Sequence, residues 1–396
     1  MIKDYIPPRA KAGSYAQWVR RAIRLARNGS VPIVSLFDSS VPEPRHLLQE
    51  SISKTTLPDF SPLYVSAFGG GNPHVLSSLA TQYQVSEEQV LCTTGATSSL
   101  GLIISTFGRP GDHILVESPG FDLFADLAED RGMIVDTIDR RPPEYSFDIK
   151  QIEARILSNT RLILLSNLHN PSGMALDYMF LAQLARLAEK RGIIVVVDEV
   201  YGDYATLEER PSPACALSPA IISVSSLTKF HGLATLRCGW IVGATPVIRE
   251  IRAFSTRLEF GVSNLAHAVA AQVLREPQVY VDYTNTTLAA SRPIVDNWFA
   301  ELSAEGLVEG VLPRSGCIFF PRLPHVADTI SFAETLIASG VIVAPGEYFG
   351  APGHIRIGFA TAAEALAPAL GIVTEALRAA SAGADGTQKT TALPLP

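Results

Sequence analysis

The stretch IIVVVDEVYGDY, Ile193–Tyr204, decides the fold of this chain. Its first five residues are all apolar and β-branched, and the acidic Asp198 follows them directly. A strand that is apolar on both faces is typical of a parallel sheet covered by helices on both sides. We therefore expect Asp198 at the tip of a central strand of such a sheet.

Apolar runs of the same kind recur on both sides of this stretch, between about residues 90 and 245. They are HILVES, MIVDTI, RLILLSN, AIISVSS and GWIVGA. Segments with helical periodicity, such as MFLAQLARLAEKRG, separate them. This alternation predicts an α/β fold: a three-layer α/β/α large domain with a mostly parallel sheet. Ligands of such sheets bind beyond the carboxyl ends of the strands, so candidate site residues are sought there.

The remaining sequence predicts a smaller α+β domain. A long helix over 277–305 leads into the segments CIFFPRL, SFAETLIASG, VIVAPG and HIRIGFA and a closing helix. The predicted division is a large domain over 46–288, a small domain over 1–45 and 289–380, and a disordered tail over 381–396.

Composition excludes several classes of protein. A chain of 396 residues that is 47% hydrophobic can bury a large core, and its formal net charge of -7 argues against nucleic acid as a partner. Its apolar runs are too short to cross a membrane, and MIKDYIPPRAKAG lacks the apolar core of a signal peptide. The four cysteines show no metal-binding spacing. We therefore expect reduced thiols, no metal and a cytoplasmic location.

Polar residues follow four of the predicted strands. The segment TTGATSSL, Thr93–Leu100, opens a helix with a glycine and hydroxyl residues, and helix N-termini bind anions. Asn170 follows the strand in LLSNLHNPSG, and Asp198 follows the strand quoted above. The fourth segment, SSLTKFHGLATLRCGW, places Lys229 before Arg237, a residue type well suited to phosphate.

Each of these features also has an ordinary structural explanation: a helix cap, a turn, or a lysine on the surface. Taken together they form the set that pyridoxal phosphate requires, namely a phosphate cradle, an acid for the pyridine nitrogen and a lysine for the aldehyde. A partly buried amine beside another cation, here Arg237, is held neutral and is therefore nucleophilic.

With these motifs in this order, from about residue 34 to about residue 360, the sequence resembles the class I/II aminotransferases of the fold-type I pyridoxal phosphate enzymes, the aspartate aminotransferase superfamily. The resemblance implies that Lys229 forms the Schiff base and shuttles protons. It implies that Asp198 pairs with the pyridine nitrogen. Tyr201 and Asn170 would hydrogen-bond the phenolic oxygen of the ring.

The resemblance also implies the remaining contacts of the cofactor. Its phosphate would be bound by Gly95, Ala96, Thr97, Ser226 and Arg237. Phe121, in ESPGFDLF, would cover the ring. Tyr64, in YVSAFGG, would reach the phosphate in the partner subunit, which implies a homodimer.

For the substrate, Arg356 in HIRIGFA resembles the arginine that grips the α-carboxylate, with Asn170 beside it. In LFDSSVPEP, Ser39, Ser40 or Val41 stands where the family places a glycine, and we assign Ser40 to the substrate site. A second glycine of the family pattern is replaced by Thr235 in KFHGLATLRCGW.

The predicted function is transfer of the amino group of an L-amino acid to a 2-oxo acid by ping-pong turnover. The alternatives keep the cofactor and change the bond that breaks: a β- or γ-lyase, a decarboxylase, or a cyclising enzyme of amino-acid biosynthesis. A non-enzymatic regulator that senses the cofactor is a more distant alternative. It would carry a DNA-binding module ahead of the fold, where only about 30 residues precede IVSLFD.

Overall fold

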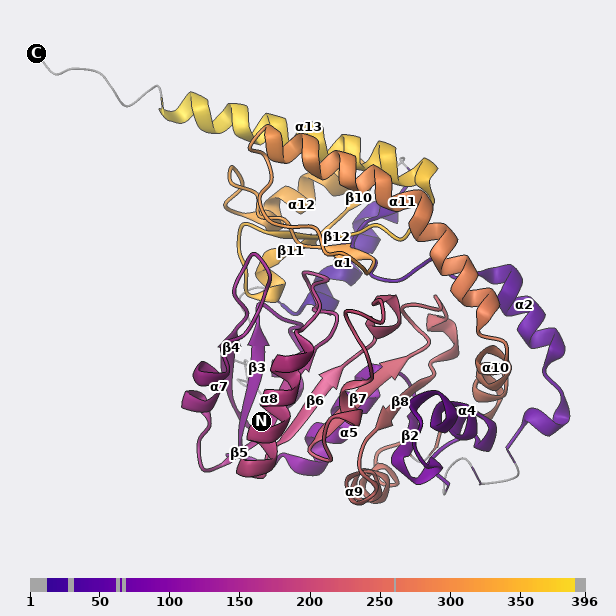
Figure 1. Ribbon diagram of the computed structural model, residues 1–396. Helices are drawn as coiled ribbons and strands as arrows, with labels where there is room; N and C mark the ends of the chain where they lie inside the picture. The colour runs from indigo at the N-terminus through magenta and orange to yellow at the C-terminus, as the bar shows by residue number, and fades with distance from the viewer. Residues whose placement is uncertain (1–12, 28–31, 62–64, 66–68, 260, 389–396) are drawn as a thin grey trace, which may run out of the picture.

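A computed structural model describes residues 13–27, 32–61, 65, 69–259 and 261–388. Its main feature is a seven-stranded sheet in the order β2-β8-β7-β6-β5-β3-β4 (Figure 1). The strands are β2 (Val90–Thr93), β3 (His113–Ser118), β4 (Ile134–Asp139), β5 (Thr160–Ser166), β6 (Ile194–Asp198), β7 (Ile221–Ser226) and β8 (Gly239–Val242). Neighbouring strands from β4 to β7 pair in parallel, and β8 is antiparallel to both β7 and β2. The predicted, mostly parallel sheet is confirmed; the short strand β2 was not among the predicted runs.

Helices cover both faces of this sheet. On β3, Ile114 and Val116 pack into the core on one face, and Leu115 packs into the core on the other. The first core contains α5 (Ala96–Phe107), α6 (Leu123–Glu129) and α9 (Thr245–Ser255). The cores on the other face contain α4 (Pro73–Tyr83), α7 (Ile149–Arg155), α8 (Tyr178–Arg191) and α10 (Asn264–Arg275). Alternate side chains of one strand thus enter different cores, which explains why the strands are apolar throughout.

A smaller unit combines the two ends of the described chain. Its elements are α1 (Tyr15–Arg27), β1 (Val34–Ser35), β9 (Ile318–Phe319), α12 (Thr329–Ala338), β10 (Val341–Ile342), β11 (Ala344–Pro345), β12 (Ile355–Gly358) and α13 (Ala363–Gln388). Strand β1 pairs in parallel with β10, so backbone hydrogen bonds join the N-terminal segment to the C-terminal part. A single core contains Trp18, Leu36 and Phe359.

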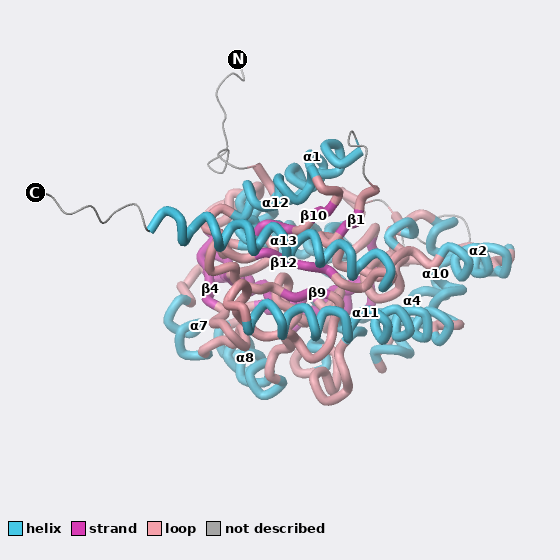
Figure 2. Tube along the Cα trace, turned by 90° about the horizontal axis from the view of Figure 1, so that it is seen from above, coloured by secondary structure: helices cyan, strands magenta, loops and turns pink. Residues whose placement is uncertain are grey.

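Along the chain, two helices connect the smaller unit to the rest: α2 (Arg45–Lys54), which packs against α10, and α11 (Gln278–Ala304). Helices α11 and α13 pack side by side across the smaller unit (Figure 2). Helix α13 includes residues 381–388, which we expected to belong to a disordered tail. These residues continue without a break from the part of α13 that packs against α11, so the helix extends beyond the predicted boundary. Among the helices in the described part of the chain, none has both the length and the apolar character that crossing a lipid bilayer demands.

Candidate active site

The lysine and the acid that sequence predicted to act together lie at the same edge of the sheet. Asp198 ends β6 and pairs with Val224 of the neighbouring β7, and Lys229 lies just beyond the end of β7. The charges of the two residues act on each other, each favouring the charged form of the other. The Nζ atom of Lys229 is 5.6 Å from the centroid of the Tyr201 ring. Parallel strands therefore bring the three predicted catalytic residues together.

The ammonium group of Lys229 loses its proton more easily than an ordinary lysine does. Burial, and next the positive charge of Arg356, lower its pKa from 10.5 to about 8. Its Nζ donates a hydrogen bond to Ser39 Oγ at 2.8 Å. The cation beside the amine is thus Arg356, whereas we expected Arg237 from its position in the same sequence segment. A neutral fraction of the amine is available near neutral pH, as a nucleophile requires.

Asp198 is buried and has few partners. Its Oδ1 accepts a hydrogen bond of 3.1 Å from the backbone N–H of Val200. Burial raises the pKa of its carboxyl group from 3.8 to about 7. A cation placed against this carboxyl group would restore its charge, and a protonated pyridine nitrogen is such a cation.

Arg356 lies on β12 and is buried. Its Nη1 donates to Asn170 Oδ1 at 2.7 Å, and its Nη2 donates to the Tyr15 hydroxyl at 2.8 Å and to the Phe37 carbonyl at 2.9 Å. Its Nε is buried and has no hydrogen-bond partner among the described residues. A buried donor without a partner costs stability, so this nitrogen suits an incoming carboxylate.

The predicted phosphate loop is an open turn at the N-terminus of α5. Gly95 has a φ of +101°, and a Cβ atom there would lie 2.5 Å from Arg237 Nη2. Arg237 donates from Nη2 to the Thr94 carbonyl at 3.1 Å. The Glu259 carboxylate already accepts hydrogen bonds from the Thr94 backbone N–H at 2.7 Å and from the Ser98 hydroxyl at 2.5 Å. The loop therefore attracts anions, as expected for a helix N-terminus beside an arginine.

Residues 68–371 match the sequence profile of the family "Aminotransferase class I and II". The chain belongs to this family of aminotransferases. Pyridoxal phosphate is the cofactor of the family, so the chain is a pyridoxal phosphate-dependent transaminase. The residues present fit the cofactor: Gly95 leaves room for a phosphate, Asp198 forms no ion pair with another described residue, and Lys229 supplies a partly neutral amine.

Similar proteins carry several different names. Capreomycidine synthase of Streptomyces vinaceus is 27% identical over 78% of this chain and 79% of its own length. Tyrosine aminotransferase of Caenorhabditis elegans is 26% identical over 78% of this chain and 69% of its own. A solved structure of a Thermus thermophilus aspartate aminotransferase double mutant superimposes with a TM-score of 0.82 at 23% identity, over 92% of this chain and 97% of that one. The last similarity shows the fold alone.

Some predicted site residues of the aminotransferase lie elsewhere or make other contacts. Ser40 is half-buried and makes no hydrogen bond with the other described site residues, whereas its neighbour Ser39 accepts from Lys229. Ser226 is buried, and its Oγ accepts from the Thr228 backbone N–H at 3.3 Å. Ala96 and Thr97 form the first turn of α5. Phe121 packs edge-on against Phe124, with ring centroids 5.9 Å apart. Tyr64 lies outside the described residues.

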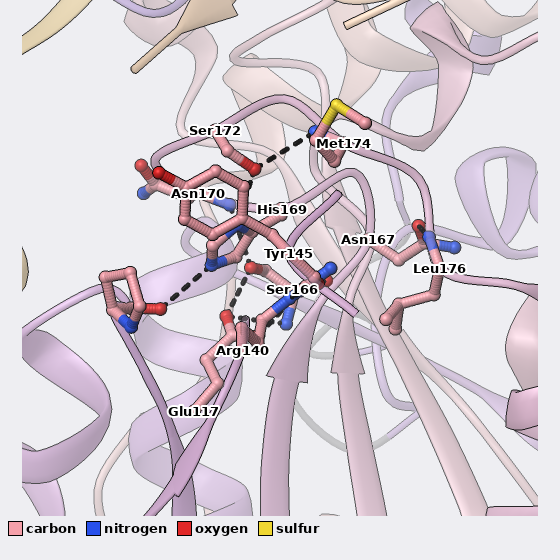
Figure 3. Close-up of polar contacts among 11 residues, drawn as sticks. Glu117, Arg140, Tyr145, Ser166, Asn167, His169, Asn170, Ser172, Met174 and Leu176 are labelled. Atoms are coloured by element: carbon pink, nitrogen blue, oxygen red, sulfur yellow. Dashed lines mark hydrogen bonds and ion pairs between the residues drawn. The ribbon is translucent and has the colours of Figure 1, made fainter. Parts of the chain in front are cut away.

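A buried polar network, which sequence reasoning missed, holds Asn170 of the aminotransferase in place (Figure 3). The Asn170 backbone N–H donates to Ser166 Oγ at 2.9 Å, and the Ser166 hydroxyl donates to Glu117. Arg140 pairs with Glu117 at 2.8 Å, and both side chains are fully buried. The sequence did contain a signal for this network: Glu117 stands near the end of the apolar run HILVES, and Arg140 ends the segment MIVDTIDR. The network therefore connects the ends of β3, β4 and β5 to the residue that contacts Arg356.

Proposed function

We propose that this aminotransferase moves the amino group of an L-amino acid to a 2-oxo acid by ping-pong turnover at Lys229. One observation carries the proposal: Lys229 lies within the electrostatic reach of both Asp198 and Arg356, with a pKa lowered to about 8. Bound pyridoxal phosphate supplies an aldehyde for the amino group and a ring that takes up the electrons released at the α-carbon. The chain supplies the amine, the proton carriers and the charges around them.

In this proposal the Lys229 Nζ would hold the aldehyde carbon of the cofactor and, once released, would carry a proton to and from the substrate α-carbon. Asp198 keeps a proton on the ring nitrogen. Asn170 and Tyr201 donate to the phenolic oxygen of the ring. Burial raises the pKa of the Tyr201 hydroxyl, so this hydroxyl keeps the proton that it donates.

The other predicted contacts remain part of the proposal. Those to the phosphate are Gly95, Ala96, Thr97, Ser226 and Arg237, with Phe121 over the ring. Arg356 and Asn170 receive the substrate α-carboxylate. Ser39, which already accepts a hydrogen bond from Lys229, is a better supported neighbour of the reacting amine than Ser40.

The substrate side chain would lie against aromatic residues. The Arg356 guanidinium carbon is 5.0 Å from the Phe349 ring centroid, and the Tyr15 ring lies 6.1 Å from that of Tyr348. Arg257 is exposed and lies over Phe254 at 5.7 Å, so it has the contacts of a surface residue. These contacts support donors with apolar or aromatic side chains over donors with a second carboxylate.

A second candidate keeps the cofactor but makes or breaks another bond of the amino acid. The similarity to a protein named capreomycidine synthase supports this candidate. The buried Arg356 favours transamination over decarboxylation, because release of the carboxylate would break its charge-assisted hydrogen bonds. A transaminase needs an added 2-oxo acid to complete its turnover, whereas a lyase or a cyclase converts its amino acid without one.

We also propose that the chain forms a homodimer in the cytoplasm, with Tyr64 reaching the partner's site. Leu57 of η1 (Leu57–Asp59) and Leu265 of α10 leave 86% and 65% of their surface exposed, although η1 and α10 pack together. Apolar side chains exposed on adjacent elements support a protein interface. The predicted domain division, 46–288 against 1–45 with 289–380, remains part of the proposal; a core formed mostly by the smaller unit supports it, whereas a cluster that contains Val41, Tyr201 and Ile318 joins the two units.

The test begins with absorbance. Protein loaded with pyridoxal phosphate should be yellow, should lose this colour with a suitable L-amino acid, and should regain it with a 2-oxo acid. Lys229→Ala should still bind the cofactor but show no turnover. A Lys229→Ala protein with wild-type turnover, or a colour that no amino acid removes from the wild type, would contradict the proposal.

The homodimer has its own test. Lys229→Ala subunits are mixed with Tyr64→Ala subunits, each of which should be nearly inactive alone. If one subunit completes the site of the other, a mixed dimer has one intact site, and partial activity returns. Activity that stays at the level of the separate variants would refute the shared site.

A further inference from the structure

Helix α1 places one aromatic residue next to the carboxylate-binding arginine. The apolar side of this helix consists of Tyr15, Trp18, Val19, Ala22 and Ile23, spaced as on one face of an amphipathic helix. Trp18 and Ala22 are buried in the core of the smaller unit. Tyr15, at the first position of the helix, is thereby held over Arg356.

The position of Tyr15 is set by contacts on several sides. Its backbone N–H donates to Asp122 Oδ2 at 2.9 Å, which connects α1 to the loop after β3. Its ring centroid lies 5.5 Å from that of Phe349 and 6.1 Å from that of Trp18. The Arg356 guanidinium carbon is 5.4 Å from the same ring. Packing of this kind fixes the ring and hence the direction of its hydroxyl group.

The Tyr15 hydroxyl oxygen accepts a hydrogen bond of 2.8 Å from Arg356 Nη2. Its own hydrogen has no acceptor among the described residues. Burial raises the pKa of this hydroxyl to about 12, so the group keeps its proton. Tyr15 therefore offers a fixed hydrogen-bond donor beside a guanidinium group.

The edge of the guanidinium group decides what this donor can reach. Nε and Nη2 form one edge of the planar group, and a carboxylate binds such an edge with both oxygens. Nε has no partner among the described residues, whereas both N–H groups of Nη2 already donate, one to the Tyr15 hydroxyl and one to the Phe37 carbonyl. A carboxylate oxygen that accepts from the free Nε would lie beside the Tyr15 hydroxyl, and the second oxygen would reach Nη2 by displacing one of these two acceptors.

We propose that Tyr15 is a substrate-binding residue whose hydroxyl donates a hydrogen bond to the α-carboxylate held by Arg356. Helix α1 is then part of the carboxylate site. This inference rests on the proposed function, because it assumes that Arg356 receives the substrate carboxylate. If Tyr15 instead only packed against Arg356 and accepted a hydrogen bond from Nη2, removal of its hydroxyl would not weaken the binding of carboxylates specifically.

The test uses the variant Tyr15→Phe, which keeps the ring and its packing and removes only the hydroxyl. Its matched control is Tyr83→Phe, because the Tyr83 hydroxyl is also buried and accepts one N–H, from Trp240 at 2.9 Å, within the large unit. The probe is 3-phenylpropionate, a carboxylate that cannot react, titrated into the holoenzyme by calorimetry. Loss of a hydrogen bond to a charged group should weaken its binding at least about tenfold in Tyr15→Phe and leave it unchanged in Tyr83→Phe.

A second probe separates the carboxylate from the rest of the substrate. L-Phenylalanine and 2-phenylethylamine differ only in the carboxylate, and each is followed by bleaching of the holoenzyme. Tyr15→Phe should lower the second-order rate constant for bleaching by L-phenylalanine by the same factor as it weakens the binding of 3-phenylpropionate. The second-order rate constant for 2-phenylethylamine should stay unchanged. Unchanged binding of 3-phenylpropionate, or equal loss with both amines, would overturn the proposal. Failure of the proposed function would give a different result, because then no amino acid would bleach the wild-type holoenzyme, even if 3-phenylpropionate bound to it.

Discussion

Replacement of Arg356 by glutamine should raise the pH at which Lys229 reacts with pyridoxal phosphate. The reacting species is the neutral amine, so the rate of cofactor loading in the apoprotein follows the deprotonated fraction of Lys229. The pKa of this lysine is lowered to about 8, first by burial and next by the charge of Arg356. Removal of the charge leaves burial in place, so the midpoint should lie between about 8 and the ordinary value of 10.5.

The magnitude follows from the titration of a single amine. With a pKa of about 8, roughly one lysine in ten is neutral at ~pH 7. With the ordinary value of 10.5, roughly one in three thousand would be. Each unit by which the variant raises the pKa should slow loading about tenfold at neutral pH, and the loss should vanish at high pH.

The assay measures the rate at which the yellow colour develops after apoprotein and cofactor are mixed, as a function of pH. The matched control is Arg237→Gln, which removes an arginine of the phosphate loop whose charge is not among the main causes of the pKa shift of Lys229. The control should load more slowly at every pH without a change of midpoint. An Arg356→Gln midpoint equal to or below that of the wild type would refute the reasoning.

Three further predictions concern the cofactor site and the network behind it. Burial raises the pKa of Asp198 from 3.8 to about 7, so the charged carboxylate destabilises the folded apoprotein fully above the higher value and not at all below the lower one. Asp198→Asn should therefore raise the unfolding free energy by up to about 4 kcal/mol in mildly alkaline urea titrations and leave it unchanged in acid. Equal effects at both pH values would contradict this. Gly95→Ala should weaken cofactor binding in equilibrium dialysis, because the added Cβ lies 2.5 Å from Arg237 Nη2, and should also lower the melting temperature of the apoprotein, because the φ of +101° disfavours alanine; unchanged affinity would show that the loop adjusts. Arg140→Met leaves Glu117 buried without its cation and should cost about 3–5 kcal/mol in chemical denaturation, whereas a neutral result would mean that Glu117 is protonated.

The sequence by itself determined the layered architecture and the edge of the sheet where the chemistry lies. The strands are recognisable because they are buried on both faces, so their residues are apolar without interruption. The polar residues that end the pattern, such as Asn170, Asp198 and Lys229, lie at the end of a strand or a few residues beyond it, and parallel strands bring such positions to one edge. That part of the site follows from local patterns alone.

The tertiary structure alone decided which distant side chains complete the site. Arg356 replaced Arg237 as the cation that acts on Lys229, and the hydrogen bond from Lys229 to Ser39 was not predicted from the sequence. Tyr15 reaches Arg356 only because β1 pairs with β10 and α1 packs into the smaller unit. The physical reason is that periodicity reports only which face of an element is buried, whereas these contacts depend on how segments far apart in the sequence pack together.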